Sequence, residues 1–376
     1  MHPSQILEYY QARESEIARL ISEIVDIESP SHNASASRAV ADWVEEQARA
    51  SGGDLEIERM SVDDGDHISI RTVPKDGQHV LVIGHTDTVH PIGTNVKNPT
   101  RAIDDRLYGC GIFDMKSGIV LMLEALKYFA STGIVPARPI RIVLSCDEEI
   151  GSFTGRSLIE RESEQAEVCL VFEPSAAGKV KTGRKGTGMF TLTAHGVPAH
   201  AGLEPDKGAN AIVEISRQID VIHQLADARV GTTVNVTTIS GGTATNVIPE
   251  HAQCEIDVRF SSIAEAERVD AAIRSLTPFD KRVSLSVSGG INRPPMERTV
   301  GVIELFERAR EKAASFGYAL EETQVGGGSD GNFVAALGVP VLDGLGIAGD
   351  GAHTLDEHIL ISDIAKRATL ITLLLM

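Results

Sequence analysis

The chain has 376 residues, of which 42% are hydrophobic and 23% are charged, a composition typical of a globular protein that excludes a disordered or fibrous chain. Its length predicts two domains, because a single domain usually holds about 100 to 200 residues. The 53 acidic and 35 basic residues give a formal net charge of -18, which disfavours nucleic acid and anionic lipid as partners because such a surface repels their phosphates.

The first part of the chain alternates between predicted helices and buried strands. Residues 4–27 place apolar side chains at helical spacings with charge on the other face, which predicts one amphipathic helix. Residues 115–129 also have helical periodicity. Continuously apolar runs predict strands that are buried on both faces, at residues 79–84, 140–145, 168–172 and, late in the chain, 339–345. This alternation is typical of a layered α/β sheet.

The middle of the chain has a different pattern. Strands are predicted at residues 189–194, 232–239, 252–260 and 283–287, and helices at 208–225 and 263–276. The resulting order, β-α-β-β-α-β, is that of the ferredoxin-like split motif. We therefore expect residues 186–290 to form a small α+β domain inserted into a larger domain, which residues 1–185 and 291–376 would share.

Neither terminus predicts a targeting or membrane segment. The first residues lack the basic start and apolar block of a signal peptide, and no run reaches the roughly 18 apolar residues of a membrane span. We therefore expect a cytoplasmic protein with no membrane partner. Its four cysteines, at positions 110, 146, 169 and 254, form no C-x-x-C pair and are expected to be buried free thiols.

Histidines and carboxylates follow several of the predicted strands. His85 and Asp87 come directly after the first apolar run, Glu148 and Glu149 follow the next one, and Glu173 ends a third. His353 follows the fourth. Open α/β sheets place their sites at these carboxyl ends of strands. Taken one at a time, a core or capping histidine and a solvated acidic loop are the structural alternatives.

Asp114 comes just before the helix predicted at 115–129, where a helix N-cap is the structural alternative to a ligand. Two imidazoles and several carboxylates without a thiolate form a donor set suited to zinc, cobalt or manganese. Two ions that share one aspartate would be the natural arrangement. The sequence thus predicts a site for two divalent metal ions, most simply zinc.

These motifs together resemble the M20 family of metallopeptidases. The resemblance is carried in order by residues 84–89, 108–118, 146–152 and 172–174. Within the family, residues 151–153, 200–202 and 326–330 are most similar to the bacterial glutamate carboxypeptidases. The resemblance implies a di-metal aminopeptidase-like catalytic domain with a mixed, mostly parallel sheet, and an inserted ferredoxin-like dimerisation domain.

By position, the resemblance also implies roles for the site residues. One metal ion would be held by His85, Asp114 and Glu173, and the second by Glu149, His353 and the same Asp114. Asp87 would orient His85. Glu148 would be the general base, taking a proton from a metal-bridging water and returning it to the leaving amine.

The family resemblance implies three further features. The peptide bond between Asp114 and Met115 would be cis. His200 would stabilise the developing oxyanion, and it would cross from the partner subunit of a homodimer paired through the inserted domain. His195, a close neighbour in sequence, has no such motif and is assigned to structure.

Substrate recognition would rest on Asn246, Arg259, Arg293 and Gly327. Arginine binds a carboxylate with two parallel hydrogen bonds, which favours a peptide or N-acyl amino acid with a free carboxylate. For Arg259 an ordinary ion pair is the alternative. The expected activity is release of a glutamate-like C-terminal residue. The alternatives are a deacylase resembling acetylornithine deacetylase or succinyl-diaminopimelate desuccinylase, and an inactive metabolite-binding relative. Two arginines disfavour an aminopeptidase.

Overall fold

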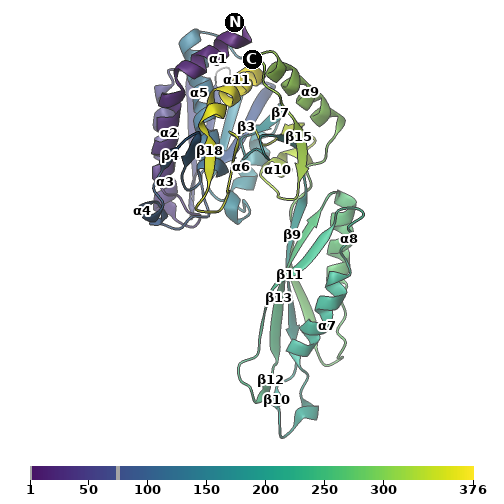
Figure 1. The fold of residues 1–376 in the computed structure, drawn as a ribbon. Coiled ribbons are helices and arrows are strands. Elements are labelled where there is room, and N and C mark those ends of the chain that lie inside the picture. The colour runs from purple at the N-terminus through teal and green to yellow at the C-terminus, as the bar shows by residue number, and fades with distance from the viewer. Residues whose placement is uncertain (1, 73–76) are drawn as a thin grey trace. The chain divides into compact units, whose positions relative to one another are not determined.

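The computed structural model describes residues 2–72 and 77–376, which fall into two compact units (Figure 1). The first comprises Met1–Gly183, Arg298–Gln324 and Ser329–Met376, and the second comprises Arg184–Glu297 and Val325–Gly328. The second unit extends beyond the expected 186–290, because its last strand continues to Arg293. Gly327 also belongs to it.

The helices are α1 Pro3–Ala12, α2 Glu14–Asp26, α3 Ala34–Ala50, α4 Thr94–Lys97, α5 Ser117–Thr132, α6 Gly155–Glu162, α7 Ala211–His223, α8 Ile263–Arg274, α9 Val300–Ala314, α10 Gly331–Ala336 and α11 Ile364–Leu375. The strands are β1 Leu55–Val62, β2 Gly65–Thr72, β3 His79–His85, β4 Arg101–Ile103, β5 Arg106–Tyr108, β6 Ile140–Ser145, β7 Ala166–Val171, β8 Val180–Arg184, β9 Gly186–His195, β10 Ala199–His200, β11 Thr233–Gly241, β12 Val247–Ile248, β13 His251–Phe260, β14 Ser284–Arg293, β15 Glu322–Val325, β16 Val341–Leu342, β17 Gly349–Asp350 and β18 His358–Leu360.

A six-stranded mixed sheet forms the centre of the first unit. Its order is β1-β2-β6-β3-β7-β16. Strands β6, β3, β7 and β16 run parallel, whereas the β1-β2 hairpin joins the edge at β6 in an antiparallel manner. All seven residues of β3 are buried. Because successive side chains point to opposite faces, helices must cover both faces of this sheet, as predicted for its continuously apolar strands.

Smaller sheets flank the main sheet. Strands β17, β18, β5 and β4 form a four-stranded sheet, and β15 pairs with β8. The four-stranded sheet determines where the segment from Gly349 to Leu360 runs, because β18 pairs with β5 from His358 to Leu360. This segment carries His353.

The second unit holds a four-stranded antiparallel sheet with two helices, α7 and α8, and the short β10-β12 pair. Its elements follow the predicted order β9-α7-β11-β13-α8-β14, and its strands lie in the order β11-β13-β9-β14. Apolar side chains from the strands and helices form its own core, which includes Phe190, Ile215, Ile256 and Val269. The predicted ferredoxin-like arrangement of these elements is therefore confirmed.

Three details concern the predictions for the chain as a whole. The expected single helix at 4–27 is wrong, because the helix is interrupted at Arg13, which separates α1 from α2. All four cysteines are buried and free, as predicted. Among the described residues, no helix is both long enough and apolar enough to cross a membrane.

Candidate metal centre

The candidate ligands gather at the carboxyl edge of the main sheet. His85 is the last residue of β3, Glu148 and Glu149 follow β6, and Glu173 lies two residues after β7. Because β6, β3 and β7 are parallel neighbours, their carboxyl ends meet at one edge. Asp114 reaches this edge from the turn before α5.

His353 reaches the same place by a route that differs from the expected one. It does not end a strand of the main sheet, but lies in the turn between β17 and β18 of the four-stranded sheet. Its φ of 66° is in the left-handed region, which directs the backbone through a tight turn. The side chain is about half exposed, whereas that of His85 is buried.

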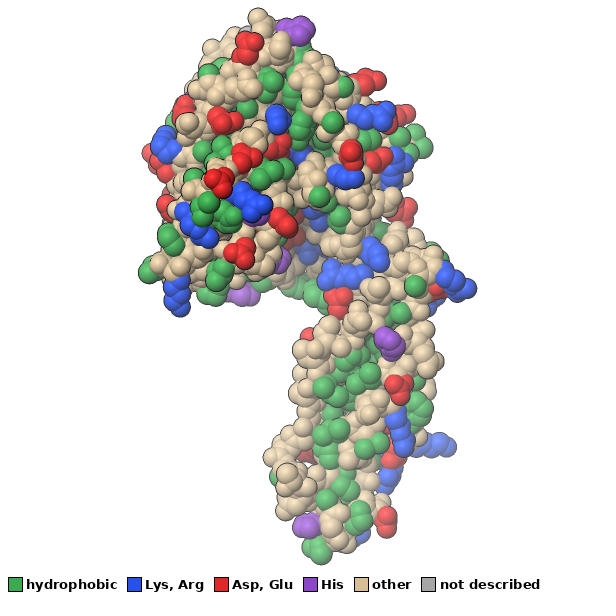
Figure 2. Space-filling model, viewed as in Figure 1, with side chains coloured by type: hydrophobic (Ala, Val, Ile, Leu, Met, Phe, Trp, Pro, Cys, Tyr) green, Lys and Arg blue, Asp and Glu red, His purple; other side chains and the backbone are tan. Residues whose placement is uncertain are grey.

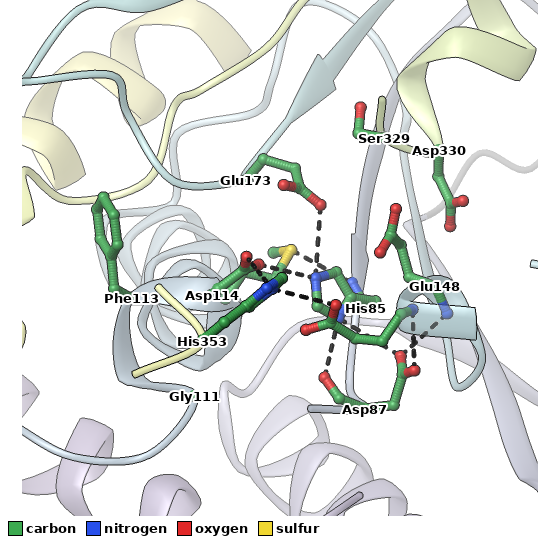
Figure 3. A network of polar contacts seen from close by, with 12 residues as sticks. His85, Asp87, Gly111, Phe113, Asp114, Glu148, Glu173, Ser329, Asp330 and His353 are labelled. Atoms are coloured by element: carbon green, nitrogen blue, oxygen red, sulfur yellow. Dashed lines mark hydrogen bonds and ion pairs between the residues drawn. The ribbon is translucent and has the colours of Figure 1, made fainter. Parts of the chain in front are cut away.

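Asp114 lies between the two histidines and presents a different oxygen to each (Figure 3). Its Oδ1 is 3.1 Å from His85 Nε2, and its Oδ2 is 3.4 Å from His353 Nε2. Glu173 Oε1 lies 3.4 Å from His85 Nε2, and Glu149 Oε2 lies 3.2 Å from His353 Nε2. The predicted ligands therefore form two groups that share Asp114.

The electrostatics of the cluster follow from this crowding. Burial lowers the pKa of His85, but hydrogen bonds with Asp114, Asp87 and Glu173 outweigh burial and hold that pKa well above its usual value. Contacts with Asp114 and Glu149 raise the pKa of His353 to about 10. Burial raises the pKa of Glu149. Carboxylates in excess of imidazoles make this a place that favours positive charge.

The residues fit divalent metal ions. Ligand atoms of His85, Glu148 and Glu173 lie within 4.8 Å of one another, and so do those of His85, Asp114 and Glu149. Within the described residues, Glu149 Oε1 is a buried oxygen without a hydrogen-bond partner. A buried carboxylate oxygen normally accepts a hydrogen bond, and coordination to a cation would take the place of that bond. Glu148, the predicted base, lies within ligand distance of the same cluster.

Asp87 holds two parts of the site in place. Its backbone carbonyl oxygen is 3.0 Å from His85 Nδ1, and its carboxylate Oδ1 is 3.4 Å from that nitrogen. The carboxylate also accepts the backbone N–H groups of Glu148 and Glu149, both at 3.1 Å, and the hydroxyl of Ser31 at 2.7 Å. Asp87 therefore fixes the loop that carries the predicted base as well as the His85 ring.

The sequence analysis did not identify several residues that support the site. Besides Ser31, Asp330 accepts hydrogen bonds from Ser145 at 2.8 Å and from Ser152, on either side of the loop that carries Glu148. Figure 3 shows Asp330 beside Glu148. A short polar side chain at a helix start gives no periodic signal, so nothing in the pattern distinguishes Asp330 from an ordinary cap.

The residues predicted to contact substrate form two groups within the second unit. His200 pairs with Val247 across β10 and β12, and the carbonyl oxygen of Asn246 accepts the N–H of Ala201 at 2.9 Å. This pair is separate from the four-stranded sheet and follows the His195 end of β9. Near the other end of β9, Arg259 and Arg293 both lie opposite Thr187. Thr187 and His195 are eight positions apart along β9, which corresponds to about 26 Å at about 3.3 Å per residue.

Each of these groups has its own contacts. Arg259 forms an ion pair with Asp257 through hydrogen bonds of 2.7 to 3.1 Å. Arg293 is buried, with Nη1 3.1 Å from Asn292 Oδ1. Buried Arg184, which the sequence analysis missed, donates to the carbonyl oxygens of Gly327 at 3.2 Å and Gly328 at 3.0 Å. His195 is exposed and contacts the ring of His251.

Carboxylates and imidazoles that converge at the carboxyl edge of an α/β sheet are typical of a metal-dependent hydrolase. The chain belongs to peptidase family M20/M25/M40, whose model matches residues 81–376. It is therefore a hydrolase of this family, and the predicted family is confirmed. The cis peptide bond expected between Asp114 and Met115 is present.

Comparisons with individual proteins agree with the family. The chain is 30% identical to carboxypeptidase G2 of Pseudomonas sp. over 96% of its own length and 88% of that protein. It is 29% identical to the succinyl-diaminopimelate desuccinylase of Hydrogenovibrio crunogenus over 96% of this chain and 99% of that one.

Solved structures share the fold. Aminopeptidase PepT from Bacillus cereus superposes with a TM-score of 0.75 at 21% identity, covering 96% of this chain and 98% of that one. An M20 family metallo-carboxypeptidase from Sulfolobus solfataricus gives a TM-score of 0.73 at 15% identity, covering 96% and 99% of the two chains. The α/β fold class predicted from the sequence is thus confirmed.

Proposed function

We propose that this protein is a zinc-dependent carboxypeptidase that cleaves the amide bond beside a free carboxylate and releases a C-terminal, glutamate-like residue. The observation that carries the metal site is Asp114, which presents separate oxygens to His85 and to His353. The similarity to carboxypeptidase G2 over nearly the whole chain supports the substrate class.

In this proposal one zinc ion is held by His85, Asp114 and Glu173, and the other by Asp114, Glu149 and His353. Ions at such a site lower the pKa of water towards neutrality and polarise the scissile carbonyl group. Glu148 takes the proton from the attacking water and delivers it to the leaving nitrogen. Asp87 accepts two backbone hydrogen bonds from the loop that carries Glu148, and these bonds fix the position of the Glu148 backbone.

His200 is the proposed oxyanion donor, and its hydrogen bonds support that role. Its Nδ1 lies 3.1 Å from the backbone nitrogens of both Gly202 and Leu203. Both N–H groups donate to Nδ1, so a neutral His200 ring must carry its proton on Nε2. The exposed ring therefore offers an N–H donor to a developing negative charge.

The carboxylate of the substrate is assigned to Arg293 and the backbone at Gly327, with Arg259 and Asn246 as further contacts. Arg184 binds the carbonyl oxygens of Gly327 and Gly328, which holds the glycine segment against the sheet end that also carries Arg293. Nothing within 4 Å would meet a side chain at Gly327, so this backbone is open to a ligand. A planar guanidinium matches a carboxylate with two hydrogen bonds.

A homodimer through the second unit completes this proposal. His200 and Asn246 belong to the separate β10-β12 segment, which follows the His195 end of β9, whereas Arg259 and Arg293 lie opposite Thr187 near the other end. About 26 Å of strand separates the two ends of β9, so one small substrate is not expected to reach both groups in a single subunit. A partner subunit would supply the missing group. Strand β11 is an edge strand, and exposed apolar side chains lie nearby on α7 and β11, among them Ile212, Val213 and Ile239. Figure 2 shows hydrophobic side chains on the surface of this unit. Unpaired strand edges are natural pairing surfaces.

The second candidate function is an N-acyl amino acid deacylase, which the similarity to succinyl-diaminopimelate desuccinylase favours. Both activities would use the same metal site and the same recognition of a free carboxylate. In both, the amino acid that carries the free carboxylate is the leaving amine; they differ in the acyl group and in the side chain of that amino acid, and substrate turnover distinguishes them.

The deciding experiment is turnover of a substrate panel by the zinc-loaded enzyme before and after chelation. The panel holds N-acyl and folyl glutamates, dipeptides, acetylornithine and N-succinyl-diaminopimelate. We expect cleavage of the acyl glutamates, loss of that cleavage with a chelator and recovery on adding zinc. Activity confined to acetylornithine or the succinyl substrate would establish the deacylase instead. Inactivity throughout would favour a metabolite-binding relative.

Replacing Arg293 by Ala should raise KM for the acyl glutamate about 10- to 100-fold and change kcat much less, because the lost contact with the carboxylate exists in both ground and transition states. Arg259→Ala is the comparison and should raise KM less, since Asp257 already occupies the guanidinium of this further contact. Steady-state kinetics of both variants measure the difference. An unchanged KM for Arg293→Ala would remove that arginine from substrate recognition.

A further inference from the structure

Glu357 is a fully buried carboxylate that receives four hydrogen bonds. Its Oε1 accepts the backbone N–H groups of Phe113 at 2.8 Å and of Asp114 at 2.9 Å. Its Oε2 accepts the N–H of Gly111 at 2.8 Å and lies 2.9 Å from Nε2 of buried His90. The relative exposure of Glu357 is 0%.

These contacts determine the shape of the turn that carries Asp114. Between Gly111 and Asp114 the chain aims three N–H groups at one point, and Gly111 has a φ of 73°. Buried N–H groups without an acceptor are costly, so the turn needs an acceptor at that point. Converging backbone N–H groups favour an anion over a neutral oxygen.

The same chain segment carries His353. Glu357 lies four residues after it, and the segment is held by the Gly351 to Thr354 hydrogen bond of 2.9 Å and by the pairing of His358 with Tyr108. The carbonyl oxygen of Glu357 also accepts the N–H of Gly109 at 3.1 Å. One short segment thus presents His353 to the cluster and binds the turn from which Asp114 projects.

Charge around the carboxylate is also compensated. Lys116 is buried on the same stretch of chain, and its ammonium group donates to the carbonyl oxygen of Ile27 at 2.5 Å. Burial lowers the pKa of Lys116, and attraction to the Glu357 carboxylate opposes that change. A carboxylate that lies out of water is stable only when hydrogen bonds and opposite charge replace its hydration. Glu357 has both.

We infer that Glu357, together with His90, positions residues of the metal centre. Glu357 fixes Asp114 between His85 and His353, and it holds the segment that carries His353 against the turn that carries Asp114. This inference rests on the proposed function, because it requires metal ions to be bound by Asp114 and His353. Glu357 accepts a hydrogen bond from the backbone of Asp114 and does not contact the metal-binding carboxylate itself. Its loss should therefore change the affinity for metal ions.

The test is zinc binding by the Glu357→Gln variant of the full chain. A glutamine amide has one oxygen, so in either orientation its NH₂ group faces a backbone N–H of the turn. The matched control is Glu214→Gln in the second unit. Glu214 is also buried, and its carboxylate accepts the N–H groups of Phe279 at 3.0 Å and Asp280 at 3.2 Å and the amide of Gln218 at 2.8 Å.

Zinc affinity is measured by competition with a chromophoric chelator, bound zinc is counted by elemental analysis, and thermal unfolding is followed on the chelated proteins. Wild type and Glu214→Gln should each bind two ions per chain, and the affinities of the variant should equal those of the wild type. Glu357→Gln should hold at least one ion about 10- to 100-fold more weakly, the usual effect of removing a group that orients a ligand. A fall in the unfolding temperatures of both chelated variants would not affect this comparison.

Two results would overturn the inference. Glu357→Gln with wild-type zinc affinities would show that the carboxylate serves the fold alone. If Glu357→Gln does not fold, His90→Leu removes one of the four donors, and unchanged affinity in that variant would have the same meaning. A wild-type chain that binds no zinc would instead reject the proposed function, and the inference with it.

Discussion

Glu148→Gln should lose about 10²- to 10⁴-fold in kcat while keeping its fold and both metal ions. Glutamine has nearly the same shape as glutamate but cannot accept the proton of the attacking water, and general base catalysis contributes a factor of this size. The backbone N–H of Glu148 would still donate to Asp87, so the loop should keep its position. Steady-state assays of acyl-glutamate cleavage measure kcat, and elemental analysis of the same samples measures the zinc bound per chain.

The neighbouring residue supplies the control for this prediction. Glu149→Gln changes the adjacent side chain in the same loop, but Glu149 faces His353 at 3.2 Å and has the buried oxygen suited to a cation. That variant should lose zinc as well as activity. A carboxylate oxygen of Glu148 also lies within ligand distance of His85 and Glu173. Loss of zinc in Glu148→Gln would therefore show that Glu148 is a metal ligand. Undiminished turnover would exclude it as the base.

The candidate ligands on the main sheet could be predicted because strand and ligand are adjacent in sequence. His85 ends a run of seven buried residues, and Glu149 and Glu173 follow similar runs. Parallel strands bring their carboxyl ends together whatever else the chain does, so the pattern alone places these side chains at one edge. The four long strands and the two helices of the second unit could be predicted for a similar reason, because each is long enough to show its period.

Contacts between distant residues could not be predicted in this way. The apolar spacing of residues 4–27 continues across Arg13, yet the helix breaks there, where the guanidinium group of Arg13 pairs with Glu124 on α5. His353 lies between strands of two and three residues, which are too short to show any period. Glu357 contacts backbone groups, which have no identity in the sequence.

His200→Ala should reduce kcat by about 10²- to 10³-fold, the effect of removing one oxyanion donor, with little change in zinc content. His195→Ala is the matched control, since this exposed histidine lies five residues earlier on the same unit and has no proposed role. It should retain full activity. Loss of activity in both variants would point to a structural effect at this end of the sheet rather than to a donor at His200.

The location of His200 in the dimer is tested by mixing inactive subunits. If His200 serves the site of the partner subunit, a heterodimer of His200→Ala and Glu148→Gln chains contains one intact site, formed by Glu148 of one chain and His200 of the other. Random exchange makes half of the dimers mixed, so about a quarter of the wild-type activity should return. If His200 instead served its own subunit, every site in the mixture would lack one group and activity would stay absent. About 26 Å separates the end of β9 beside Arg259 and Arg293 from its His195 end, after which the chain continues to His200. This separation favours recovery, because one subunit is then not expected to place both groups on the same substrate.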